Sequence, residues 1–255
     1  MRFWARIKEK LYNYFSSRGY TCDVCGAEVF EYPNARLCKD CQNALFKNTE
    51  RVCEKCGRHT LAEGICLTCK REPPKFRTGY SPLVYRGETA SMVNRMKNGN
   101  PRLALWFGEE AADYFCALFK EKEKFLNSEE SLLVVPVPLT DAKRRQRGYN
   151  QAEMLAKSFC KRLTENGFKL ELRTDILQRL RDAEEQKHMG FAERHITASA
   201  IYHVHKRKEC RERTIIVIDD IMTTGATGSA CADRLYGAGA KEVYFVAATA
   251  LPEQQ

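Results

Sequence analysis

Apolar residues in this chain of 255 residues fall into short continuous runs and helical stripes that alternate over its C-terminal two thirds. Runs rich in β-branched residues predict buried strands at 132–137, 201–205, 215–218 and 242–250. Periodic stripes predict helices at 88–97, 103–119, 152–163 and 229–236. Strands that alternate with helices indicate an α/β fold with a mainly parallel sheet, which binds ligands at the carboxyl ends of its strands.

The same pattern divides the chain into three parts. We expect residues 1–20 to form an amphipathic helix, because Phe3, Ile7, Leu11 and Phe15 share one helical stripe. Packing of this helix on its own domain is the simplest interpretation, and a membrane surface or a partner helix is the alternative. Residues 21–72 form a cysteine-rich module, and the Pro73-Pro74 pair separates it from a larger domain at 73–255.

The cysteine-rich module carries eight of the twelve cysteines, arranged as four CxxC pairs. The pairs are Cys22/Cys25, Cys38/Cys41, Cys53/Cys56 and Cys66/Cys69. Each pair can supply half of a tetrahedral zinc site, so the spacing predicts two structural zinc ions with four thiolates each. Both sequential and cross-braced pairing fit the spacing. A disulfide framework needs an oxidising compartment, which nothing in the sequence indicates.

Composition and charge narrow the class of protein. There is no apolar run of about 18 residues, so we expect no transmembrane segment, and the charged N-terminus is unlike a secretory signal. The formal net charge is +9. Residues 1–75 hold 14 Lys/Arg against 9 Asp/Glu, so the positive charge is denser there. This excess fits a polyanionic partner such as nucleic acid, although scattered basic residues also keep an ordinary surface solvated.

The strongest local signal is the segment IIVIDDIMTTGAT at 215–227. A buried strand leads into two adjacent carboxylates, Asp219 and Asp220, and then into a loop of small residues before a helix. Vicinal carboxylates accept hydrogen bonds from the two hydroxyls of a ribose. A loop of small residues at a helix N-terminus binds a phosphate through its backbone N–H groups. The pattern therefore predicts a ribose-phosphate site.

This segment resembles the phosphoribosyl pyrophosphate (PRPP) signature of type I phosphoribosyltransferases. Together with VVPVPL at 134–139, RGYNQA at 147–152, RDAEEQKHMGFAER at 181–194 and the four CxxC pairs, it resembles the ComF family. The resemblance runs from Thr21 to Pro252. It implies an α/β fold of the Rossmann-like type I phosphoribosyltransferase kind, with a zinc-binding module in front.

The resemblance implies a role for each matching position. Asp219 and Asp220 hold the ribose hydroxyls. The 5-phosphate is held by Thr223, Thr224, Gly225, Ala226 and Thr227. The pyrophosphate loop contains Pro138, Leu139 and Thr140, with Arg147 beyond it. Three further candidates are Lys97, in the less typical segment RMKNG, and Gln186 and Arg194, in a loop that closes over PRPP in related enzymes. No residue stands out as a catalytic base.

Two functions follow from this resemblance as expectations. The ComF family implies a part in DNA uptake and natural transformation, in which the chain handles incoming single-stranded DNA beside a DNA-translocating ATPase of the ComFA type. An active phosphoribosyltransferase is the alternative, with Mg²⁺ bound together with PRPP and an unknown nucleobase or amine as acceptor. Either function places the chain in the cytoplasm, and DNA uptake places it near the inner face of the membrane.

Overall fold

The computed structural model describes residues 21–30, 36–127, 129–180 and 201–253. By its internal contacts the chain forms two compact units, Met1–Leu45 and Phe46–Gln255. The helix expected at 1–20 lies outside the described residues. The division between the two units falls at residues 45 and 46, well before the Pro73-Pro74 pair, so the two halves of the cysteine-rich segment belong to different units.

The first unit is small where it is described. Thr21 and Glu28 form an isolated antiparallel bridge around the first CxxC pair. The only helix in its described part, α2 (Lys39–Asn43), begins after the second pair's first cysteine. Apart from its cysteines, the buried apolar residues of its described part are Val29, Leu37 and Leu45. So small a core leaves the four cysteines as the main candidates for holding this unit together.

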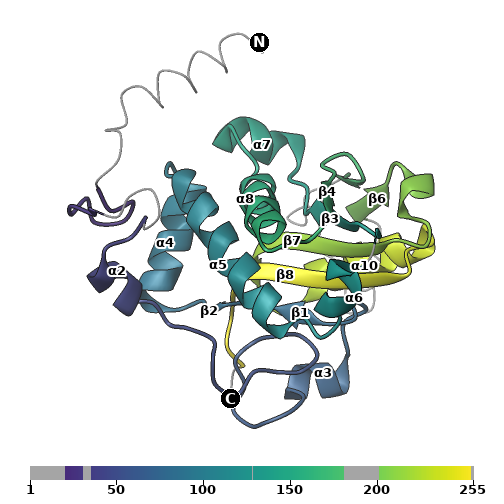
Figure 1. The fold of residues 1–255 in the computed structure, drawn as a ribbon, viewed down its shortest axis with the longest axis horizontal. Helices are drawn as coiled ribbons and strands as arrows, with labels where there is room; N and C mark the ends of the chain where they lie inside the picture. Colours follow the sequence, from purple (N-terminus) through teal and green to yellow (C-terminus); the bar gives the residue numbers. More distant parts are fainter. Residues whose placement is uncertain (1–20, 31–35, 128, 181–200, 254–255) are drawn as a thin grey trace, which may run out of the picture. The chain divides into compact units, whose positions relative to one another are not determined.

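The second unit is built on a parallel sheet (Figure 1). The strand order is β1-β8-β7-β3-β4, and β2 also pairs with β8. These strands are β1 (Gly79–Tyr80), β2 (Leu83–Val84), β3 (Leu132–Pro136), β4 (Leu170–Leu172), β7 (Thr214–Met222) and β8 (Glu242–Ala250). A separate antiparallel pair consists of β5 (Leu177–Arg179) and β6 (Tyr202–Val204).

Helices pack on both faces of this sheet. The described helices of the second unit are α4 (Gly87–Lys97), α5 (Arg102–Leu118), α6 (Lys122–Leu126), α7 (Asp141–Arg147), α8 (Gln151–Glu165) and α10 (Ala226–Gly237), with the short α3 (Leu67–Arg71) and the 3-10 turn η2 (Arg207–Cys210). Of these, α5, α8 and α10 make the main contacts with the strands. Among the described residues, none of the helices combines the length and apolarity needed to cross a membrane.

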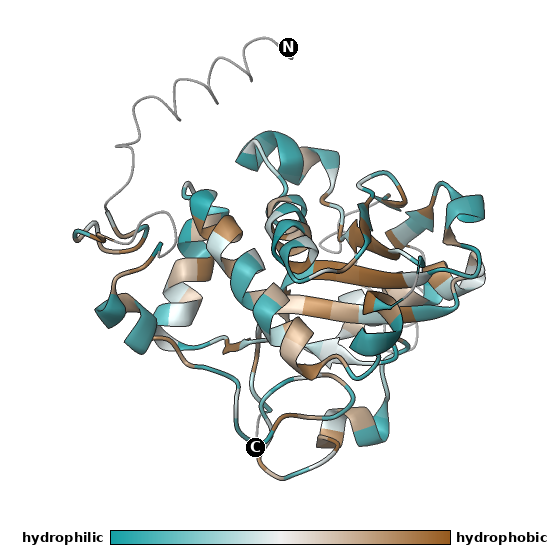
Figure 2. Ribbon diagram, viewed as in Figure 1, coloured by the Kyte–Doolittle hydropathy of each residue, from teal (hydrophilic) through white to brown (hydrophobic). Residues whose placement is uncertain are grey.

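The central strands are buried on both faces, as expected for a parallel sheet covered by helices. Ile215, Val217 and Phe245 belong to a core shared with α10, β5 and β6. Alternate residues of the same strands face α5 and α8, which lie side by side in Figure 1. Figure 2 shows β7 and β8 as apolar strands beneath helices with polar outer surfaces.

The fold class predicted from the sequence is confirmed: the chain is an α/β protein with a mainly parallel sheet and cysteine clusters at its N-terminal end. The four helices and four strands predicted between residues 88 and 250 are all present, with bounds that differ by a few residues. The largest difference concerns the strand predicted at 215–218, which continues to Met222 because Ile221 and Met222 pair with Thr249 and Ala250 of β8. The structure adds several short elements where the sequence predicts no regular element: α2, α3, α6, α7, β1, β2, β4, β5 and η2.

Candidate functional site

The two adjacent carboxylates lie inside the last part of β7. Asp219 pairs in register with Ala247 of β8, and Asp220 is 6% exposed. The Asp220 backbone N–H donates to Asp219 Oδ1 at 2.8 Å. Partial burial and the neighbouring Asp220 carboxylate raise the pKa of Asp219 well above its ordinary value of 3.8. Two adjacent acids that are partly or fully buried are costly to keep ionised together, and such a pair is typical of a binding site.

Asp220 has two side-chain donors. Lys97 Nζ, from the last residue of α4, lies 3.0 Å from Asp220 Oδ2. Gln151 Nε2, from the first residue of α8, donates to the same oxygen at 3.0 Å. Neither contact uses Asp220 Oδ1. Lys97 is therefore brought to the two carboxylates, whereas the sequence indicated only that it belongs somewhere in the site.

The five residues of the predicted phosphate loop form a tight turn and the start of α10. Gly225 takes a left-handed conformation (φ 84°) that a residue with a side chain adopts only at a cost, and it is the N-cap of α10. The Thr224 hydroxyl accepts from the Ala226 N–H at 3.3 Å. Ala226 and Thr227 occupy the first turn of a helix of 12 residues, where backbone N–H groups lack helical partners. This arrangement suits an anionic ligand.

The predicted pyrophosphate loop, 138–140, leaves the sheet beside the carboxylates. Pro136 pairs with Ile218, and the Val137 N–H donates to Ile218 O at 2.8 Å. Val137, the residue directly before the loop, therefore lies at the level of Asp219 in the neighbouring strand. Thr140 caps α7 by accepting from the Lys143 N–H. Arg147 is the last residue of this helix, for which the sequence analysis predicted no regular element.

The turn between α7 and α8, residues 147–151, joins the candidate segments. Gly148 ends α7 in a left-handed conformation (φ 80°). The Tyr149 hydroxyl donates to Met96 O, next to Lys97. Asn150 Nδ2 donates to Val137 O at 3.1 Å, at the start of the pyrophosphate loop. Arg147 Nη1 donates to Gln151 Oε1 at 3.0 Å, so Gln151 links Arg147 to Asp220.

The sequence analysis named only Arg147 from this turn as a site residue. Tyr149, Asn150 and Gln151 were missed, although the segment RGYNQA was part of the resemblance. The signal that could have revealed them is the run of consecutive side chains able to form hydrogen bonds in this short turn between two helices. Gln186 and Arg194 lie outside the described residues.

The β5–β6 pair lies beside the phosphate loop. Tyr202, 4% exposed, interacts with Asp219 and with the Thr227 side chain, and its burial raises its pKa. The Arg179 guanidinium lies 5.7 Å from the centre of the Tyr202 ring. Tyr202 thus brings next to Asp219 a segment to which the sequence analysis assigned no role.

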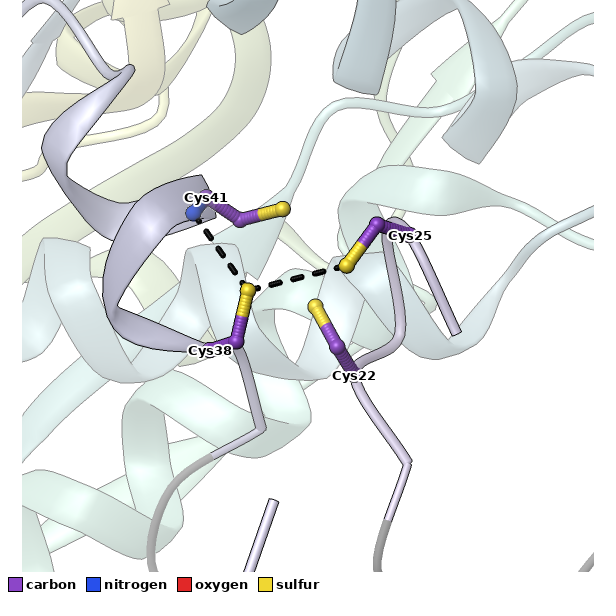
Figure 3. A group of neighbouring side chains, drawn as sticks. All are labelled: Cys22, Cys25, Cys38 and Cys41. Carbon is purple, nitrogen blue, oxygen red and sulfur yellow. Dashed lines mark hydrogen bonds between the residues drawn. The ribbon is translucent and has the colours of Figure 1, made fainter. Parts of the chain in front are cut away.

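The first group of four cysteines, Cys22, Cys25, Cys38 and Cys41, is in the first unit (Figure 3). All four side chains point toward one another, and their sulfur atoms lie within 4.8 Å of one another. Burial raises the pKa of Cys22, but backbone N–H groups of Cys25, Cys38 and Val24 outweigh that effect and lower it to about 7. The chain thus favours a thiolate at this position.

The second group, Cys53, Cys56, Cys66 and Cys69, is in the second unit. All four residues are at most 4% exposed and belong to the core that contains β7, β8 and α10. Gly57 follows Cys56 and packs against Gly79 of β1 so closely that a Cβ on Gly57 would lie 2.2 Å from Gly79 O. The Gly79 N–H donates to Lys55 O at 2.9 Å.

These two groups settle the pairing that the spacing left open, because the first two CxxC pairs gather together and so do the last two. Four thiolates at this spacing fit zinc, which four protein ligands hold in a closed structural site. The positive charge of Arg58, 5% exposed, supports this donor set at the second group. Burial opposes that charge, but the thiolates of Cys56, Cys66 and Cys69 raise the pKa of Arg58.

Two curated proteins are similar to the chain over most of its length. Competence protein ComFC of Bacillus subtilis strain 168 is 25% identical over 202 residues, which cover 76% of this chain and 75% of that protein. Competence protein F of Haemophilus influenzae Rd is 22% identical over 233 residues, 91% of this chain and 96% of that protein. The resemblance to competence proteins of the ComF type is thereby confirmed.

No family model matches the chain. Among solved structures, a hypoxanthine phosphoribosyltransferase from Staphylococcus aureus covers 57% of this chain and 76% of its own, with 12% identity and a TM-score of 0.34. This similarity is too low to bear on the function.

Proposed function

We propose that the second unit binds PRPP at the carboxyl ends of β3 and β7. The observation that carries this proposal is the meeting of Asp219 and Asp220 with Lys97 at the end of β7, directly before the helix start at Gly225. Carboxylates suit the ribose hydroxyls, and a left-handed glycine at the start of a helix suits the 5-phosphate. The two needs of a phosphoribosyl group are met within one segment of nine residues, 219–227.

The remaining parts of the ligand have partners nearby. The 138–140 loop, which starts beside Asp219, would bind the pyrophosphate through its backbone, with Lys97 and Arg147 supplying positive charge. Mg²⁺ bound with PRPP would reduce the charge of the pyrophosphate, and it keeps most of its waters, so it needs few protein ligands. Asp219 is the carboxylate better placed for it, since Asp220 already takes Lys97 and Gln151.

The biological role that we propose is in DNA uptake during natural transformation. The support is the similarity to two competence proteins, and the net charge of +9 fits a polyanionic partner. In this role the chain handles incoming single-stranded DNA next to a DNA-translocating ATPase of the ComFA type, in the cytoplasm at the inner face of the membrane. The two cysteine groups hold structural zinc and carry out no chemistry.

A second candidate is an active phosphoribosyltransferase, which the intact set of carboxylates, lysine and phosphate loop favours. An acceptor nitrogen would attack C1 of the ribose, and the bond from C1 to the pyrophosphate oxygen would break. Pyrophosphate would leave with the bonding electron pair, stabilised by Lys97, Arg147 and Mg²⁺. The acceptor would lose its proton to solvent, because the described part of the chain offers no obvious base beyond the two carboxylates.

Calorimetric titration with Mg-PRPP tests the binding site. We expect saturable binding to the zinc-loaded protein, and its loss in Asp219→Asn with Asp220→Asn. Asp113→Asn is the matched control, because Asp113 is an exposed carboxylate whose partner is Arg162. Equal Mg-PRPP affinity in the double variant and the wild type would refute the ribose assignment.

The two functions are separated by two further measurements. Pyrophosphate release from Mg-PRPP, measured with nucleobases, ammonia and single-stranded DNA as acceptors, supports the enzyme if one acceptor triggers it. Binding of labelled single-stranded DNA should weaken steeply with salt if the chain neutralises phosphates. If the protein shows no pyrophosphate release with any acceptor and no salt-dependent DNA binding, both candidate functions are contradicted.

A further inference from the structure

The turn at 147–151 places one side chain, Gln151, between the two halves of the candidate site. Gln151 is 4% exposed, so it has little access to water. Its Nε2 donates to Asp220 Oδ2 on the ribose side. Its Oε1 accepts from Arg147 Nη1 on the pyrophosphate side. Each end of the amide thus contacts a different charged residue of the site.

The chemistry of the side chain fits this position. An amide offers donors on one atom and an acceptor on the other, so it can bond to a carboxylate and to a guanidinium at the same time. A carboxylate in its place would have no donor for Asp220, and an amine would have no acceptor for Arg147. Because it is neutral, Gln151 also orients Asp220 without cancelling the charge that the ribose hydroxyls would meet.

We propose that Gln151 is the positioning residue of the phosphoribosyl site, which fixes Asp220 and Arg147 relative to each other. This inference rests on the proposed PRPP site. Gln151 does not touch the ligand in this scheme. It acts through Asp220, which it shares with Lys97, and through Arg147, whose guanidinium donates to its Oε1.

The neighbouring residues of the turn support a positioning role. Tyr149 is tied to Met96 and Asn150 to Val137, so the turn is attached to the segments that carry Lys97 and the pyrophosphate loop. Asn150 also caps α8, since its Oδ1 accepts from the Ala152 N–H at 3.0 Å. The backbone at Gln151 is therefore fixed at three points before its side chain makes any contact.

Two variants of Gln151 test the proposal by titration with Mg-PRPP. Gln151→Leu removes both hydrogen bonds, and we expect its affinity to fall at least about tenfold, because hydrogen bonds to charged groups are the strong ones. Gln151→Glu keeps the shape but places a third carboxylate beside Asp219 and Asp220. At low pH that carboxyl takes a proton and donates to Asp220 as the amide does, so affinity relative to wild type should recover as the pH falls.

Ser158→Ala is the matched control. Ser158 lies two turns further along α8 and loses one hydrogen bond, to Leu105 O, away from the site. Thermal unfolding of all three variants separates loss of fold from loss of affinity. If Gln151→Leu does not fold, the nearly isosteric Gln151→Glu still decides the matter through its pH profile.

The outcomes distinguish this inference from the function on which it rests. Wild-type protein that fails to bind Mg-PRPP would overturn the proposed site and this inference together. Wild-type binding with Gln151→Leu within twofold of it would overturn only the inference. The inference alone is also overturned if the Mg-PRPP affinity of Gln151→Glu changes with pH in parallel with that of wild type. A selective affinity loss, with pH-dependent recovery in Gln151→Glu, supports it.

Discussion

Replacing one cysteine in the first group should leave ligand binding largely intact, whereas replacing one in the second group should abolish it. Cys25→Ser and Cys56→Ser are a matched pair, because each residue is the second cysteine of its first CxxC pair and each precedes a glycine with positive φ. Cys25 lies in the first unit and is exposed, whereas Cys56 is 0% exposed in the core of the second unit. We expect both variants to lose one zinc ion.

The magnitude follows from where each group is attached. A structural zinc ion contributes about 10–16 kcal/mol to the folded state of its module. A whole domain is stable by only about 5–15 kcal/mol. The second group shares its core with β7, β8 and α10, and Lys55 beside it donates to Phe76 O and Arg77 O. Phe76 in turn stacks on Phe245, with ring centres 5.3 Å apart. Loss of this zinc should therefore unfold the unit that holds the candidate site.

The assay combines zinc content by mass spectrometry, thermal unfolding and Mg-PRPP titration. Cys25→Ser should keep the main unfolding transition and at least half of the wild-type PRPP affinity. Cys56→Ser should lose the cooperative transition and all measurable PRPP binding. If Cys56→Ser lost its zinc yet bound PRPP as tightly as Cys25→Ser, the second group would have no part in holding the site, and this reasoning would be refuted.

Two further predictions concern the segment at 219–227. The pKa of Asp219 is raised in the folded state, so the folded protein binds the proton more tightly than the unfolded chain and its stability falls as the pH rises above about 3.8. Asp219→Asn should remove this fall and thus stabilise the protein at neutral pH. Denaturant unfolding at pH 4, 6 and 8 measures the free energy of unfolding of both proteins, and an equal dependence on pH in the two would contradict the prediction. Gly225→Ala should lower the free energy of unfolding by about 1–2 kcal/mol, because φ at this residue is 84°. The same substitution should also weaken PRPP binding. The control is Gly237→Ala, where an added Cβ meets nothing within 4 Å, and it should leave PRPP binding unchanged.

Local patterns were sufficient to predict most of the fold. The runs at 132–137 and 242–250 are continuous and apolar because their strands are buried on both faces, and this burial is visible in the sequence. The end of β7 was harder to predict. Asp219 and Asp220 interrupt the apolar run, yet the strand continues because β8 supplies partners as far as Ala250. Pairing with a distant strand leaves no mark in a local window.

The candidate site divides in the same way. The conformation of the predicted phosphate loop depends on small residues and a left-handed glycine within five positions, so a short motif is enough to predict this turn. Gln151 depends on a contact with Asp220, 69 residues away, and on the turn at Gly148 that brings α8 to β7. The assignment of cysteines to two groups also needed the structure, because CxxC spacing is the same in either arrangement.

The turn at 147–151 also has a consequence for how the protein folds. Three side-chain hydrogen bonds from this turn, those of Tyr149, Asn150 and Gln151, span 53, 13 and 69 residues of sequence, so two of them close long loops. Contacts of this kind form late, since the entropy of loop closure is lost before they bring any gain. We therefore expect newly made or partly refolded chains to form local helices such as α8 before they can bind ligand. Recovery of ligand binding would then lag behind recovery of helical structure in a refolding experiment.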